Sequence, residues 1–83
     1  MTGKWKVFEK GDFGTLWINK NKKLAISFRD WKKYGIASDL NYPYDVELLK
    51  YGKNYVVTDI LESKTFRTEK DAMKYAEKLK KAV

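Results

Sequence analysis

The sequence predicts an α+β fold, in which an antiparallel sheet of four to five strands is packed on one face by a single C-terminal helix. Two patterns carry this prediction. Apolar and polar residues alternate in several short runs up to residue 61, as in strands, whereas apolar positions from residue 68 onward recur at helical spacing. The chain has 83 residues without a visible repeat, so residues 1–83 are expected to form one small domain.

The first predicted strands form a hairpin. Thr15–Asn19 and Lys23–Trp31 both alternate, and the polar link Asn19–Lys22 between them is typical of a turn. Lys4–Phe8 is a candidate additional strand. Lys32–Asn41 is expected to be a loop or a short helical turn.

A second hairpin and the helix follow. Tyr44–Lys50 and Asn54–Leu61 flank Tyr51–Lys53, where Gly52 can adopt the positive φ that a tight turn needs. Phe66 leads into the helix.

The helix begins with a capping signal. Thr68 followed by Asp71 resembles a capping box, and Glu69 favours the positive end of the helix dipole. The apolar positions expected to face the sheet are Ala72, Ala76, Leu79 and Val83. The opposite face carries Lys70, Lys74, Lys78 and Lys81. These lysines are expected to be either a solvated face or a secondary phosphate contact.

Charge is distributed unevenly along the chain. The formal net charge is +7, with basic residues concentrated in 1–33 and 63–83 and acidic residues in 34–62. Two basic blocks predict one positive face that would attract a polyanion, and ordinary solubility charge is the alternative. Cysteine and histidine are both absent, which excludes catalytic triads, Cys-His pairs and most zinc sites. We therefore predict a non-enzymatic protein without a cofactor or metal.

The sequence contains no run of eighteen apolar residues, so no membrane span is expected. The first six residues lack the apolar core of a signal peptide. A cytoplasmic location is the resulting expectation.

One face of the sheet is expected to stay open, because a single helix covers only one side. Strand alternation, with Leu16 and Ile18 assigned to the helix side together with Ile26, places Trp17 on the open side. The predicted nucleic-acid-binding set is Trp17, Lys20, Lys22, Lys23, Arg29, Trp31, Lys32 and Lys33. Rings interleaved with cations suit single-stranded nucleic acid, because bases stack on the rings while the cations neutralise phosphates.

Four alternatives stay open for this surface, and one of them is a strand register different from the one assumed here. Trp17 and Trp31 are instead buried if Trp5 and Phe8 cover them, or if a partner subunit does. The same face fits a protein-binding module, such as a phage-encoded or regulatory inhibitor, because aromatic residues and arginine anchor protein interfaces. DNA is favoured over RNA, and both a monomer and a homodimer are compatible with the sequence.

The run Ile26–Lys32 resembles a strand of the positive-cofactor type of transcriptional coactivator, which has a similar aliphatic-Ser-x-Arg-Asp-aromatic-Lys pattern. The resemblance implies a curved antiparallel sheet followed by a helix, dimerisation and single-stranded DNA binding, with Arg29 and Trp31 on the DNA path. The additional hairpin before the helix departs from that pattern.

The region from Gly52 to Ala72 is similar to the sheet-plus-helix domains of recombinase arm-binding and ethylene-response proteins. That resemblance implies insertion of the sheet into the duplex major groove. The corresponding strand residues are acidic here: Asp45, Glu47 and Asp59. Small basic archaeal chromatin proteins are similar in composition alone.

One enzyme hypothesis concerns Asp45 with Glu62 and Lys64, which echo the carboxylate-lysine arrangement of restriction-type nucleases. The aspartate lies one position later than in that pattern, and the chain is short for that fold.

Overall fold

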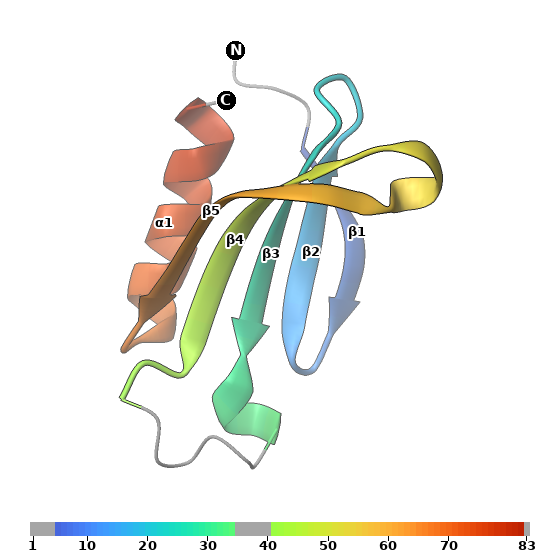
Figure 1. The fold of residues 1–83 in the computed structure, drawn as a ribbon. Coiled ribbons are helices and arrows are strands. Elements are labelled where there is room, and N and C mark those ends of the chain that lie inside the picture. Colours follow the sequence, from blue (N-terminus) through green and yellow to red (C-terminus); the bar gives the residue numbers. More distant parts are fainter. Residues whose placement is uncertain (1–4, 35–40, 83) are drawn as a thin grey trace.

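Five strands follow one another in a single antiparallel sheet in the computed structural model, which describes residues 5–34 and 41–82 (Figure 1). Their order in the sheet is their order in the chain. The elements are β1 (Lys6–Gly11), β2 (Gly14–Asn19), β3 (Leu24–Asp30), the 3-10 turn η1 (Trp31–Tyr34), β4 (Tyr44–Tyr51), the 3-10 turn η2 (Lys53–Tyr55), β5 (Val57–Phe66) and the helix α1 (Glu69–Ala82). The predicted α+β fold, an antiparallel sheet followed by one C-terminal helix, is confirmed.

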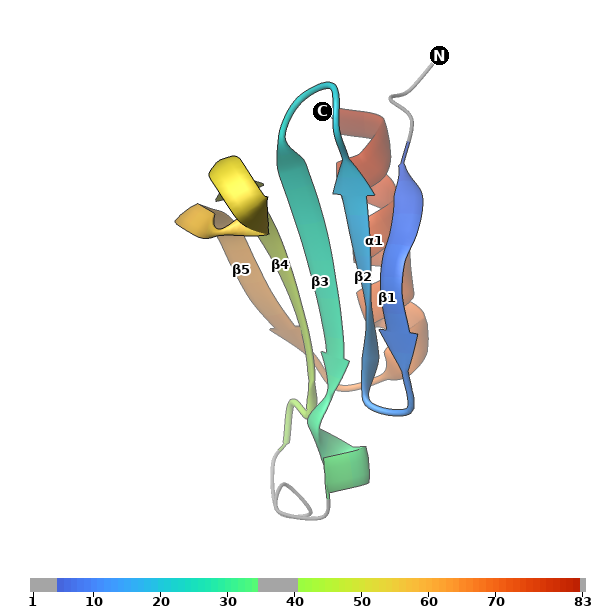
Figure 2. The same cartoon turned by 90° about the vertical axis from the view of Figure 1, so that its right-hand side faces the viewer.

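Helix α1 covers the β3–β5 part of one sheet face, and Figure 2 shows it on the side opposite the β4–β5 hairpin. The Asp71 N–H donates to the Thr68 Oγ1 at 3.2 Å, so the predicted cap starts the helix. Ala72, Ala76 and Leu79 are buried against the sheet, as predicted. The predicted lysine stripe of the helix is exposed; Val83 lies outside the described residues.

Apolar clusters lie on both faces of the sheet. The cluster beneath the helix combines the buried helix residues with Trp17, Ile26, Phe28, Val46 and Leu48. A smaller cluster on the opposite face consists of Ile18, Ala25, Leu49 and Tyr51, with Leu16 packed against it. The face that the helix leaves open is therefore apolar at its centre.

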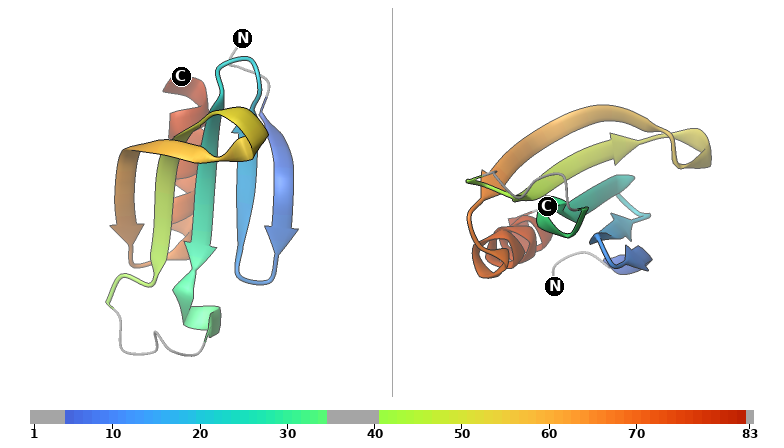
Figure 3. Two further views of the ribbon diagram at one scale, coloured as in Figure 1. Left: turned by 45° about the vertical axis from the view of Figure 1, so that its right-hand side comes forward. Right: turned by 90° about the horizontal axis from the view of Figure 1, so that it is seen from below.

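The β4–β5 hairpin bends across this open face, as Figure 3 shows. The pairing of β4 with β5 shifts between Leu48 and Leu49 and again between Lys50 and Tyr51. Such bulges bend a strand and increase its twist. As a result, η2 at the tip of the hairpin comes to lie opposite β1 and β2.

The first strand differs from the prediction. We expected Lys4–Phe8, whereas β1 spans Lys6–Gly11 and turns through Asp12 and Phe13 into β2. At the start of β2, Gly14 permits close pairing with β3, because a Cβ there would collide with the carbonyl oxygen of Phe28. The segment predicted as a loop or short helical turn, Lys32–Asn41, begins within η1, and residues 35–40 lie outside the described residues.

Candidate functional site

Strand register places Trp17 on the helix side of the sheet, so its predicted position on the open face was wrong. Asn19 pairs with Leu24, and the four residues between them form the turn. A turn with an even number of residues pairs odd positions with even ones, and Trp17 therefore stands opposite Ile26. Our prediction had aligned even positions with even ones.

Trp17 is 8% exposed and has a structural role beneath the end of α1. The Lys80 Nζ lies 4.1 Å from the centroid of the Trp17 ring, which is a cation–π geometry. The Trp5 Nε1–H donates to the Lys80 carbonyl oxygen at 3.2 Å, tying the start of the described chain to the helix. Trp5 packs against the same apolar cluster as Trp17, whereas Phe8 lies on the other face. Trp17 is buried because of the strand register, not because Trp5 and Phe8 cover the open face.

The other predicted residues form two groups at opposite ends of β3. Lys20, Lys22 and Lys23 are exposed in the β2–β3 turn. At the other end, Arg29 lies on the open face and is followed by η1, where Lys32 and Lys33 are exposed. At about 3.3 Å per residue, the seven residues of β3 separate the groups by roughly 23 Å.

Trp31 belongs to η1 rather than to the strand, because β3 ends at Asp30. Its Nε1–H donates to the Asp45 Oδ2 at 2.7 Å, and the Arg29 guanidinium carbon lies 5.7 Å from the ring centroid. The Asp30 Oδ1 accepts the backbone N–H groups of Lys32 and Lys33 at 3.1 and 3.3 Å. Trp31 is thus half-buried and fixed in orientation beside Arg29.

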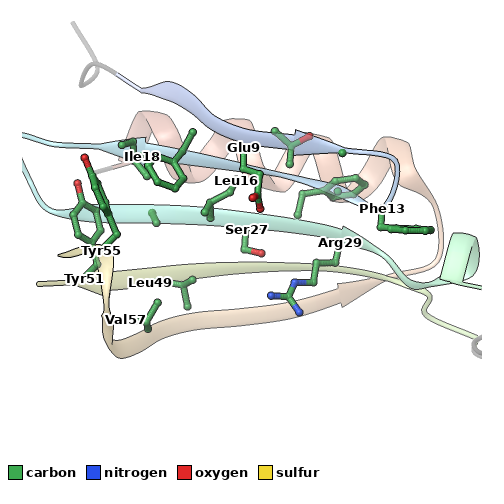
Figure 4. Close-up of a pocket in the computed structure, with 16 residues that line it drawn as sticks. Glu9, Phe13, Leu16, Ile18, Ser27, Arg29, Leu49, Tyr51, Tyr55 and Val57 are labelled. Atoms are coloured by element: carbon green, nitrogen blue, oxygen red, sulfur yellow. The ribbon is translucent and has the colours of Figure 1, made fainter. Parts of the chain in front are cut away.

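A groove of about 430 Å³ lies on the open face between the two cationic groups (Figure 4). We call it the open-face groove. Its floor is formed by Leu16, Ile18, Ala25, Ser27 and Leu49 from the three central strands. The bent β4–β5 hairpin forms one wall and β1 forms the other. The open-face groove, which the sequence did not predict, thus lies between the two predicted cationic groups.

Aromatic rings stand at both ends of the open-face groove. Phe8, Tyr51 and Tyr55 form the end near the β2–β3 turn: the Phe8 and Tyr55 ring centroids are 4.7 Å apart, and those of Tyr51 and Tyr55 are 5.5 Å apart. Phe13 lines the end near Arg29. Phe8, Phe13 and Tyr55 are 46%, 41% and 46% exposed, which is high for large apolar rings.

A strand bulge and two residues with positive φ orient the Phe8 and Tyr55 rings toward the groove. A bulge between Val7 and Glu9 makes Phe8 an extra residue of β1, so that Phe8 and Glu9 both line the groove. Asn54 and Tyr55 both have a φ of 58°, a left-handed conformation that turns the hairpin tip toward Phe8. Gly11 and Gly14, which bracket the β1–β2 turn, are the sequence signal that would have extended β1 and placed Phe8 in the strand and Phe13 in the turn.

The side chains that line the open-face groove carry one negative and one positive charge. Glu9 and Arg29 are the charged side chains among those that line it. The lysines of the two cationic groups lie beyond its ends, and Lys53 is exposed in η2 at the aromatic end. Helix α1, whose lysines are exposed, lies on the other side of the sheet from the open-face groove (Figure 2).

A second, smaller cavity of about 290 Å³ lies on the helix side, between the β1–β2 hairpin and the first turn of α1. Lys10, Asp30 and Glu69 bring charges of both signs to its lining. Burial, with the charges of Asp30 and then Glu69 adding, raises the pKa of nearby Tyr44 above its ordinary value. The mixed signs give this cavity no clear preference for an ion.

The nuclease-like residues do not converge. Asp45 shares the open face with Thr65, its partner across the β4–β5 pair. Glu62 and Lys64 stand opposite Leu48 and Val46, which face the helix. Within residues 5–34 and 41–82, no group of three acidic side chains is placed to hold a metal ion.

Comparisons with protein-family models, with curated proteins and with solved structures found no match for this chain. None of the helices in the described part of the chain has the length and apolar character needed to span a membrane.

Proposed function

We propose that this chain is a non-enzymatic, cytoplasmic protein that binds nucleic acid, preferably single-stranded DNA and with weak sequence selectivity, in its open-face groove. The observation that carries the proposal is the exposure of Phe8, Phe13 and Tyr55 along one groove whose two ends carry cations. Exposed rings stack on bases, and stacking is worth about 1–3 kcal/mol per base.

Single strands suit this arrangement better than duplexes. Bases in a duplex are stacked on one another, so they are not available to the rings of the groove, whereas a single strand can turn its bases toward them. The lysines at the β2–β3 turn and at η1 then lie where the phosphates enter and leave. The resemblance of Ile26–Lys32 to coactivator strands points to the same ligand and favours DNA over RNA.

The test is a titration of a fluorescently labelled single-stranded oligonucleotide, followed by anisotropy, with a duplex of the same sequence beside it. We expect Phe8→Ala and Tyr55→Ala each to weaken single-strand binding about ten-fold, as the loss of one stacked base implies. Val7→Ala is the matched control, because Val7 is an exposed apolar residue of the same strand outside the open-face groove. Equal losses in all three variants would contradict a groove site.

Salt dependence tests the cationic ends. Replacing Lys20, Lys22 and Lys23 with alanine should lower the slope of log affinity against log salt by roughly 2, since each phosphate contact on a single strand contributes about 0.7. The matched control replaces Lys70, Lys74 and Lys78, which removes the same charge from the far side of the molecule. Absence of binding at low salt would overturn the proposal.

A second candidate function, binding to a protein partner, is favoured by the apolar floor of the groove. Leu16, Ile18 and Leu49 offer a surface for apolar side chains, and Arg29 with Trp31 supplies the residue types that anchor protein interfaces. Such a complex requires no affinity for bare oligonucleotides. The titration above therefore distinguishes the two candidates.

A further inference from the structure

Glu9 is the one acidic side chain among the residues that line the open-face groove. The bulge in β1 turns it to the same side as Phe8, and Figure 4 shows it reaching over the groove floor on the side of Ser27. Among the described residues no hydrogen bond or ion pair engages its carboxylate, and Arg29, the other charged lining residue, does not pair with it. The groove thus presents an unused hydrogen-bond acceptor beside its rings.

A carboxylate is unfavourable in a site for a polyanion unless something in the ligand donates to it. An ionised carboxylate accepts hydrogen bonds and cannot donate them. Cytosine carries an exocyclic amino group at the edge where thymine carries a carbonyl oxygen. A base stacked beside Phe8 would therefore gain a hydrogen bond from Glu9 if it is cytosine, and would meet repulsion between two acceptors if it is thymine.

We infer that Glu9 is a specificity-determining residue of the open-face groove and selects bases that carry an exocyclic amino group over thymine and uracil. This inference rests on the proposed function, since it concerns which single strands the same groove prefers. Ser27, whose hydroxyl can donate or accept, lies next to Glu9 in the groove and does not impose a choice by itself. The selectivity is therefore assigned to the carboxylate.

The experiment compares oligodeoxycytidine with oligothymidine of equal length, each labelled and titrated by anisotropy at neutral pH and one salt concentration. The protein is expected to bind oligodeoxycytidine about five- to ten-fold more tightly, near the low end of the discrimination that one base contact gives, because Glu9 is exposed. Glu9→Gln should abolish this preference, mainly by tightening oligothymidine binding, because an amide can donate to the thymine carbonyl.

Glu62→Gln is the matched control, since it removes the same charge from β5 opposite Leu48, away from the groove. It should keep the cytosine preference. Circular dichroism checks that the variants fold, which is expected because both side chains are exposed.

The outcomes separate the two proposals. Equal affinity of the unmodified protein for the two oligonucleotides would overturn the inference and leave the proposed function standing. Tighter binding of Glu9→Gln to both oligonucleotides by the same factor would also overturn it, because that result reflects general charge repulsion. No binding to either oligonucleotide would overturn the proposed function, and the inference with it.

Discussion

The indole N–H of Trp31 donates a hydrogen bond to the Asp45 Oδ2. The other carboxylate oxygen of Asp45, Oδ1, is buried without a hydrogen-bond partner in the described structure. The Asp45 Oδ2 hydrogen bond stabilises the fold, whereas the desolvation of the unpaired Oδ1 opposes it. The two consequences can be separated by substitution.

Asp45→Ala should destabilise the fold by about 1–3 kcal/mol, because it leaves the partly buried Trp31 N–H without its acceptor. Asp45→Asn should cost less than the alanine variant, since its amide oxygen can still accept that hydrogen bond. Urea unfolding monitored by tryptophan fluorescence measures both free energies. An asparagine variant as unstable as the alanine variant would argue against this account of the Asp45 carboxylate.

Among the elements, the β1–β2 hairpin depends on one glycine. Gly14 pairs with Arg29 and approaches the Phe28 carbonyl so closely that no Cβ fits, whereas a Cβ at Gly11 would meet nothing within 4 Å. Both glycines lie beside the same turn, so they form a matched pair.

Gly14→Ala should destabilise the protein by about 1–3 kcal/mol, the range for overpacking a well-packed site. Gly11→Ala should change the stability by less than about 0.5 kcal/mol, as surface substitutions usually do. Thermal unfolding followed by circular dichroism compares the two. Similar melting temperatures for both variants would contradict the tight β2–β3 contact.

Local sequence signals predicted most elements but could not predict which side of the sheet each strand residue faces. The Thr68 cap and the buried alanines of α1 follow from spacing within one helix, and both are confirmed. The side of the sheet to which each β2 side chain points depends on the register between β2 and β3. That register is set by the four-residue turn between the two strands. A shift of one residue moves every side chain to the other face, and Trp17 was misplaced for that reason.

At the scale of the whole molecule, the open-face groove could not be predicted because it depends on the bend of the β4–β5 hairpin. The bend brings Tyr55 to Phe8, 47 positions apart in the chain, and neither strand alone indicates that contact. The cationic ends were predictable, since Lys20, Lys22, Lys32 and Lys33 lie in or near turns. The sequence therefore predicted the two cationic groups, whereas the groove between them depends on tertiary structure.

Helix α1 covers only part of the sheet, and this should determine which strand unfolds locally first. The helix packs on β3, β4 and β5, whereas β1 is exposed along its whole length and pairs on one side only, with β2. Amide hydrogens of β1 should therefore exchange with deuterium fastest among the strands, through detachment of this edge alone, and those of β3 slowest. Because Phe8 and Glu9 belong to β1, a ligand held in the groove would slow exchange there first. Exchange as fast in β3 as in β1 would mean that the sheet opens as one unit.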